Sequence, residues 1–418
     1  MKKALKFFVI LFLPFVLFAQ TNTFPKWEKG FLDIHFISTG RGNAAFYILP
    51  DGTTLLVDVG ELSPIDSVRH PKAMPNDSKS PAEWVADYIY QFHPEGKNAK
   101  LDYTLITHFH DDHMGSFGNA KKTCEAGEYK LSGITELGSL IPIKKLIDRG
   151  YDWPLNFGDP DFQKKIMSDK MGAMILGQFN EYWKFIEYQK KINGLEYEKF
   201  RVGSSNQIKM KKYPSEFPEF KIKNLFADGD ISAVDDSTIA IRKYKDGEQV
   251  SENNLSIGIR ISYGEFDFYT GGDIPGIGFA GGIDENSMES AVAPVIGPVD
   301  VATLNHHGNR DTQNELFVKT IQPRVWIGQS WTVRHPGEEV LRRITSKYIY
   351  PGERDVFTNF LHPVNRIYLA KLAEDSYKST SGHIVVRVYP KGEKYDVFIL
   401  NDKDEQREVL SQYHYQSR

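Results

Sequence analysis

The chain has 418 residues, of which 40% are apolar and 25% are charged, and its formal net charge is −4. This composition excludes an intrinsically disordered chain, because it supplies enough apolar surface for one large domain or two small ones. The slightly acidic charge also gives no overall basic field that would attract a long polyanion, although a local groove can still be basic.

The first residues predict a targeting segment and not part of the fold. Three lysines within the first six residues precede an apolar run at 7–18, and Ala19 follows it. This is the order found in secretory signal peptides. We therefore expect residues 1–19 to be removed, which makes the mature protein periplasmic or secreted, without a stable membrane span. The alternative is an uncleaved membrane anchor, which the short length of the run and its internal proline disfavour.

The residues that follow predict strands and one helix in quick succession. Short β-rich runs broken by glycine, proline and aspartate indicate strands at residues 32–39, 43–50, 53–60 and 101–107. Residues 80–92 predict a helix, with Ser80 as its N-cap and a proline at its first position.

The second half of the chain repeats this pattern. Further strands are indicated at residues 220–227, 255–262, 265–272, 299–305, 324–330, 383–390 and 394–400. Further helices are indicated at residues 287–295, 313–323 and 336–348. The alternation of strands and helices in both halves predicts an α/β sandwich. We place this domain at 28–402, followed by a C-terminal tail at 403–418.

The segment between the halves, at about 120–220, has a different character. It is rich in lysine, tyrosine and phenylalanine, contains no histidine, and includes a predicted helix at 179–192. We interpret it as a helical insertion over one face. Within it, residues 190–213 interleave cations with aromatic rings, which can bind a polyanion. A solvated surface of the insertion is the interpretation we favour.

A dense cluster of metal-ligand side chains follows the strand that ends at Thr107. His108 and His110 lie two residues apart, so in extended backbone both rings point the same way and can hold one ion. Asp112 and His113 follow where the chain turns, and they can face a second ion. Histidine nitrogen with carboxylate oxygen is the ligand set of hydrolytic zinc, with manganese or iron as alternatives. The opposing interpretation, a solvated polar turn, does not explain this density of ligands.

This cluster resembles the T-H-x-H-x-D-H signature of the metallo-β-lactamase fold superfamily. The resemblance implies a four-layer αβ/βα sandwich with a centre of one or two metal ions between its sheets. Other stretches are similar to the extracytoplasmic hydrolase domain of the competence protein ComEC: residues 35–60, 253–274, 300–311 and 335–344. Together these stretches cover the two halves of the mature chain and imply a metal-dependent hydrolase.

The resemblance also assigns roles to individual residues. It implies that Asp58 orients a ligating histidine and that Asp273 is shared between two ions. It implies a last ligand from the doublet His306 and His307. We favour His307 as the ligand and His306 as a group that touches substrate, although spacing leaves the choice open. The catalytic set expected from the resemblance is Asp58, Asp112, Asp273 and His306.

The chain departs from the superfamily pattern at the first ion. Many members supply a third histidine between the motifs, but residues 114–272 contain none. We therefore expect the position held by His108 and His110 to be the weaker one. Asp148 is a candidate to complete it, and the alternative is an ordinary aspartate at a helix boundary.

Two further residues are expected near substrate. The ComEC-like loop often carries an acid where this chain has Asn43, which can keep a hydrogen bond without the charge. His335 matches a position near the site in the same group. We interpret His35 as a packing residue in a strand. The remaining histidines are expected to be structural or superficial: His70, His93, His362, His383 and His414.

The expected reaction follows from the ligands. A metal ion lowers the pKa of its water toward neutrality, so that hydroxide can attack phosphorus or a carbonyl. We therefore predict a secreted hydrolase of a phosphodiester or related phosphate ester, either small or linked to the cell wall. Nucleic acid remains an alternative substrate that the charge does not indicate, because dense phosphate binding relies on clustered lysine and arginine. The alternatives are a β-lactam or lactone hydrolase and a non-catalytic, metal-binding surface protein.

Overall fold

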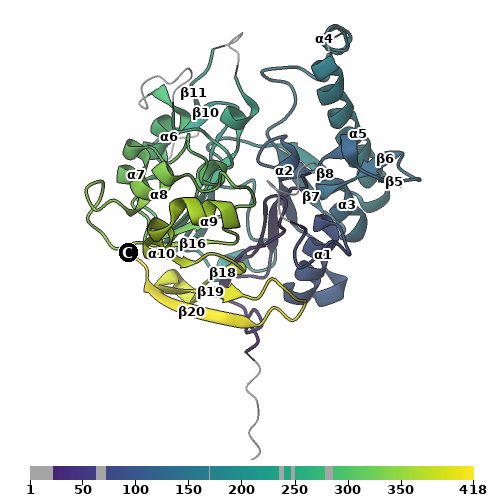
Figure 1. Ribbon diagram of the computed structural model, residues 1–418. Helices are drawn as coiled ribbons and strands as arrows, with labels where there is room; N and C mark the ends of the chain where they lie inside the picture. The colour runs from purple at the N-terminus through teal and green to yellow at the C-terminus, as the bar shows by residue number, and fades with distance from the viewer. Residues whose placement is uncertain (1–21, 63–71, 169, 235–239, 246–249, 278–285) are drawn as a thin grey trace, which may run out of the picture.

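The computed structural model describes residues 22–62, 72–168, 170–234, 240–245, 250–277 and 286–418. Two large sheets pack face to face, and helices cover the outer face of each sheet (Figure 1). This is the layered α/β sandwich that the sequence predicted. The predicted signal peptide and His70 lie outside the described residues.

The first sheet has nine strands and changes from antiparallel to parallel pairing at β3. In the order in which they pair, they are β20 (Val409–Gln416), β19 (Lys394–Leu400), β18 (His383–Val388), β1 (Leu32–Phe36), β2 (Ala44–Ile48), β3 (Thr54–Val59), β4 (Tyr103–Leu105), β7 (Lys145–Asp148) and β8 (Glu196–Lys199). Its outer face packs against α1 (Pro81–Phe92), α3 (Gly133–Leu140) and α5 (Lys170–Asn193). The predicted cap of α1 is confirmed, since the Ser80 side chain accepts a hydrogen bond from the Glu83 amide at 3.1 Å.

The second sheet also has nine strands and changes to parallel pairing at β13. Its strands, in pairing order, are β11 (Ala240–Arg242), β10 (Asp230–Ser232), β9 (Phe220–Ala227), β12 (Gly258–Tyr263), β13 (Phe266–Thr270), β14 (Val301–Thr303), β15 (Val325–Gly328), β16 (Asp355–Thr358) and β17 (Tyr377–Ser379). The helices that belong to this half are α6 (Met288–Ile296), α7 (Glu315–Ile321), α8 (Glu338–Thr345), α9 (Pro363–Leu369) and α10 (Lys371–Ser376). Short elements complete the chain: α2 (Asp111–Met114), α4 (Pro160–Ile166) and the hairpin of β5 (Lys122–Cys124) and β6 (Tyr129–Leu131).

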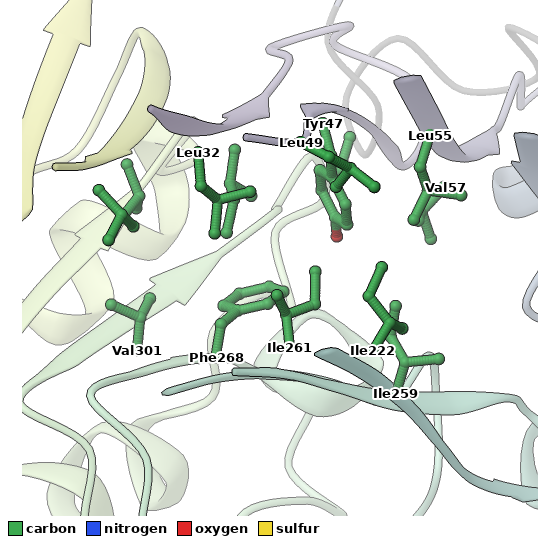
Figure 2. Packing of buried hydrophobic residues seen from close by; sticks show 14 of the residues in the cluster. Leu32, Tyr47, Leu49, Leu55, Val57, Ile222, Ile259, Ile261, Phe268 and Val301 are labelled. Carbon is green, nitrogen blue, oxygen red and sulfur yellow. The ribbon is translucent and has the colours of Figure 1, made fainter. Parts of the chain in front are cut away.

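The main hydrophobic core lies between the two sheets (Figure 2). Alternate residues of each strand point to opposite faces, so Leu32 and Tyr47 of the first sheet face Ile261 and Phe268 of the second. The other faces of these strands are buried under helices, as Phe46 and Ile48 show. Burial on both faces explains why the central strands are almost continuously apolar in sequence.

Two boundaries differ from the sequence prediction. The segment at 120–220 is not only an insertion, because β7 and β8 within it extend the parallel part of the first sheet. These strands escaped recognition because they are short and β8, at the sheet edge, carries exposed charged residues. The predicted tail at 403–418 forms β20, which pairs with β19. Among the described residues, no helix combines the length and apolar character needed to cross a membrane.

Candidate metal centre

The candidate centre lies where strands of both sheets end. In the first sheet, β3 carries Asp58 and the chain beyond β4 carries the cluster at 108–113. In the second sheet, Asp273 follows β13, and the histidine doublet follows β14 in a short 3₁₀ helix, Asn305–Gly308. The carboxyl ends of neighbouring parallel strands meet at one edge of a sheet, which is where α/β proteins collect functional side chains.

The first ligand group contains Asp112, His113, Asp273 and His307, and one ligand atom from each lies within 4.8 Å of the others. The His307 Nε2 lies 3.1 Å from the Asp273 Oδ2 and 3.3 Å from the Asp112 Oδ2. The His113 Nε2 lies 3.2 Å from the Asp273 Oδ1. Three of these side chains are buried and that of Asp112 is partly exposed.

The second ligand group contains His108, His110 and again Asp273, with the same spacing. The His108 Nε2 faces the His110 Nδ1 at 3.1 Å and lies 3.7 Å from the Asp273 Oδ2. His108 is fully buried, whereas His110 is exposed. The Asp273 carboxylate therefore lies between the two groups, as expected for the shared residue.

Asp58 has the orienting position expected of it. Its Oδ1 accepts the Thr107 amide at 2.8 Å, and its Oδ2 accepts the Thr107 hydroxyl at 2.9 Å. The same Oδ2 lies 2.8 Å from the His113 Nδ1. Because a carboxylate only accepts, Nδ1 carries a proton, so in neutral His113 the lone pair lies on Nε2, toward the cluster.

His307 is held in the same tautomer by a different partner. Its Nδ1 lies 3.1 Å from the main-chain oxygen of Gln329. A carbonyl oxygen can only accept, so in neutral His307 the lone pair is on Nε2. The His113 Nε2 and the His307 Nε2 are 3.3 Å apart. When both rings are neutral, two lone pairs and two carboxylates converge on one small volume, which is the arrangement that a bound cation stabilises.

Protonation is the way these residues balance their charge without a metal. Burial lowers the pKa of His113, but nearby carboxylates, first that of Asp273, outweigh burial and hold the pKa well above its usual value. Burial raises the pKa of Asp273, and the surrounding histidines reverse this and hold it well below its usual range. In the metal-free protein the positive charge therefore lies on the His113 imidazole, and a metal ion has to displace a proton from this ring when it binds.

The two histidines of the doublet have different surroundings in the structure. His307 belongs to the first ligand group, whereas the His306 Nε2 is 3.9 Å from the Asp273 Oδ2 and outside both groups. The His306 Nδ1 lies 3.1 Å from Asp311. Burial lowers the pKa of His306, but the Asp273 and Asp311 carboxylates raise it to about 9. Both doublet residues adopt left-handed backbone, with φ of 46° and 57°, which is unusual for residues other than glycine.

His335 lies beside the doublet. Its ring centroid is 4.9 Å from that of His307 and 6.3 Å from that of His306. It is 6% exposed, and among the described residues its Nδ1 has no hydrogen-bond partner. Burial, with the neighbouring histidines, holds the pKa of His335 well below its usual value. The structure thus places His335 next to the doublet, and its role toward substrate stays a prediction.

Asn43 reaches the centre mainly through its main chain. Its main-chain amide donates to the main-chain oxygen of Asp112 at 2.8 Å, and its main-chain oxygen accepts a hydrogen bond from the Gly60 amide at 2.8 Å. A Cβ on Gly60 would be 1.7 Å from the Asp112 oxygen, so this approach requires glycine. The Asn43 Oδ1 is buried without a partner among the described residues, in a small cavity also lined by Asp58.

Asp148 does not complete the second group. Of the residues that the structure describes, neither group includes it. Its carboxylate accepts hydrogen bonds from the Tyr182 and Tyr197 hydroxyls, each at 2.9 Å, and from the Gly150 amide at 2.8 Å. These bonds show that Asp148 stabilises the end of β7 and is not directed at the histidines, which corrects the sequence hypothesis.

The other histidines that the structure describes have partners outside the two ligand groups. His35 is buried and lies 2.9 Å from the Tyr88 hydroxyl, as expected for packing. His383 accepts the Ser38 amide, and His362 accepts the Val364 amide at the start of α9. His93 is buried and accepts the Glu95 amide. His414 lies on β20 beside Asp396.

Sequence reasoning missed several groups that complete the centre. The Gln329 carbonyl and Trp331, whose ring centroid is 3.9 Å from that of His307, both follow β15. Asp311 was also missed, and so was Asn253, whose Nδ2 is 3.4 Å from the His306 Nε2. A main-chain carbonyl cannot be recognised from the residue type. However, Gln329 and Trp331 follow a strand that is parallel to β14, so a prediction of the strand order would have placed them near the doublet.

Comparisons with known proteins add little to this geometry. No protein-family model matches the chain, and no curated protein sequence matches it. Among solved structures, the chain is similar to AbOPH, described as a hydrolase in the beta lactamase superfamily. The identity is 14%, the TM-score is 0.31, and the match covers 62% of this chain and 76% of that chain. A likeness of this size carries no argument about fold or activity.

Proposed function

We propose that the protein is a metal-dependent hydrolase of the metallo-β-lactamase superfamily that cleaves a phosphodiester or related phosphate ester outside the cytoplasm. The observation that carries this proposal is the pair of facing nitrogens, the His113 Nε2 and the His307 Nε2, 3.3 Å apart beside the Asp273 carboxylate. Nitrogen and oxygen donors in this mixture fit zinc, with manganese or iron as alternatives.

The donor sets fit two ions that share Asp273. Asp112, His113 and His307 would hold one ion, and His108 and His110 the other. Such ions, when bound, supply a water of lowered pKa and neutralise charge on the attacked ester.

The protein's own side chains supply orientation and a proton. Asp58 fixes the tautomer of His113, and the Gln329 carbonyl fixes that of His307. His306 is 19% exposed and is held by Asp311, so it places a ring that can carry a proton 3.9 Å from the Asp273 carboxylate. In this position it can bind a substrate oxygen or protonate a departing one.

A phosphate ester is favoured over a lactam by the chemistry of this surface. Two positions that share one carboxylate suit displacement at phosphorus, where the entering and leaving oxygens both need charge neutralisation. The His306 ring adds a further positive group next to them. The ComEC-like stretches, including the doublet and the segment that begins at His335, support the same substrate class.

The test is turnover by the zinc-loaded protein on three chromogenic reporters: a bis-aryl phosphodiester, an aryl phosphomonoester and a cephalosporin. We expect the diester to have the highest kcat/KM, and chelation or Asp273→Asn to abolish its turnover. Faster lactam turnover that is lost in Asp273→Asn would contradict the substrate class. Absence of turnover on all three, with metal bound, would favour the non-catalytic surface protein.

A further inference from the structure

A pocket of about 160 Å³ opens beside the candidate metal centre. Six apolar side chains line it: Phe109, Met114, Phe157, Met174, Ile175 and Phe179. Its polar lining comes from His110, Gln178 and Glu252. From this pocket we infer that the substrate carries a compact apolar group, such as one aromatic ring, next to the phosphate that is hydrolysed. The inference rests on the proposed function, because it assigns part of the substrate of the same centre.

The pocket is continuous with the centre through His110. This side chain belongs to the second ligand group and is also part of the pocket lining. A molecule that fills the pocket therefore contacts a side chain of the second ligand group. This continuity favours a substrate group over a separate partner as the occupant.

The walls of the pocket are held in place by contacts outside it. Gln178 of α5 accepts the Phe117 amide at 2.7 Å and donates to Asp111 at 2.5 Å, which ties this helix to the ligand-bearing α2. Phe179 stacks on Phe157 with ring centroids 5.2 Å apart. Figure 1 shows α4 and the beginning of α5 standing out from the body of the molecule, beyond α2. The pocket is formed where this projecting helix meets the centre.

The charge of the pocket also favours a neutral, apolar occupant. Glu252 is paired with Arg149 through two contacts, at 2.7 and 2.8 Å. Arg149 itself lies over the Phe109 ring, 4.5 Å from its centroid. The carboxylate is thus balanced inside the wall, and the exposed part of the lining is mainly hydrocarbon.

Size and exposure point to a ring-sized group. A cavity of about 150 Å³ with apolar walls is known to accept benzene. Met174 is 56% exposed and Ile175 is 43% exposed, so two large apolar side chains border the opening. Covering them with a ligand removes apolar surface from water, which is favourable.

The experiment compares two phosphonates of equal charge, methylphosphonate and benzylphosphonate, by calorimetric titration into zinc-loaded protein. We expect benzylphosphonate to bind about tenfold more tightly or better, because its ring is buried. Ile175→Trp, which fills the opening, should reduce this ratio to near one, and Ile175→Glu should weaken the benzyl compound selectively. Ile192→Trp is the matched control, since Ile192 is 49% exposed on the same helix, about 25 Å further along its axis.

Binding of 2-naphthol to metal-free protein by equilibrium dialysis separates this inference from the proposed function. Wild type and Ile192→Trp should bind it saturably, and Ile175→Trp should not. Equal affinity for the two phosphonates in wild type, or naphthol binding that Ile175→Trp does not change, would overturn the inference. Failure of both phosphonates with naphthol binding retained would contradict the phosphate-ester proposal and leave the pocket assignment standing.

Discussion

The two ligand groups differ in how firmly the protein holds them. In the first group, the outer nitrogens of His113 and His307 are bound by Asp58 and by the Gln329 carbonyl, and both rings are buried. In the second group, His110 is exposed, and Asp148, which could have been an additional ligand, is bound by tyrosines. Ligands that are already oriented lose less entropy on binding, so the first group should hold its ion more tightly.

The largest expected effect comes from the residue that the two groups share. Asp273→Asn removes the charge that faces both sets of histidines, so we expect both ions to bind poorly. Loss of a group that only orients a ligand typically costs about 10–100-fold. Because Asp273 itself faces both ions, we expect diester turnover to fall by more than about 100-fold. Metal content by atomic emission and kcat/KM check this. Retention of one full equivalent of tightly bound metal would show that Asp273 is not shared.

A smaller effect is expected from Asp58→Asn. The asparagine amide can donate to the His113 Nδ1 and so favour the wrong tautomer, with its proton on Nε2. We expect metal affinity of the first group to fall about 10–100-fold, with little change in the second. Competition with a chelator of known affinity measures this. An equal loss at both positions would mean that Asp58 acts on the whole fold, and a thermal melt of the metal-free variant serves as the control.

The smallest expected effect concerns pH. In metal-free protein the pKa of His113 is raised, so the ring is protonated near neutrality and a metal ion must displace this proton. Affinity should therefore rise about tenfold per pH unit until the pH passes that raised pKa. The same proton stabilises the metal-free fold fully below the unfolded pKa of about 6.5, and this stability is lost as pH rises through the folded pKa. Calorimetry in buffers of different ionisation enthalpy detects the released proton; no release would contradict the assignment.

The part of the centre that lies in one short segment of the sequence was predictable. His108, His110, Asp112 and His113 lie within six residues, and extended backbone followed by a turn is enough to divide them. Asp273 and His307 lie far away in sequence. They were assigned by resemblance. The fold brings them close to the segment at 108–113 because strands of both sheets end on the same side of the sandwich.

The features that were not predicted from the sequence depend on tertiary packing. The choice between His306 and His307 follows from left-handed backbone and from partners on other loops, which spacing does not encode. Likewise, β7 and β20 were missed because a short strand and an amphipathic terminal strand become recognisable only when their neighbours in the sheet are known. The pocket beside His110 arises from α5, whose apolar residues looked like an ordinary helix face.

The most direct test of unequal ligand groups is a calorimetric titration of zinc into metal-free wild type and His110→Ala. His110 is exposed, so its replacement should leave the fold intact. The structure predicts two separable affinities in wild type, of which only the weaker disappears in His110→Ala. Two positions that fill at the same concentration, or loss of the tighter one in His110→Ala, would contradict this account.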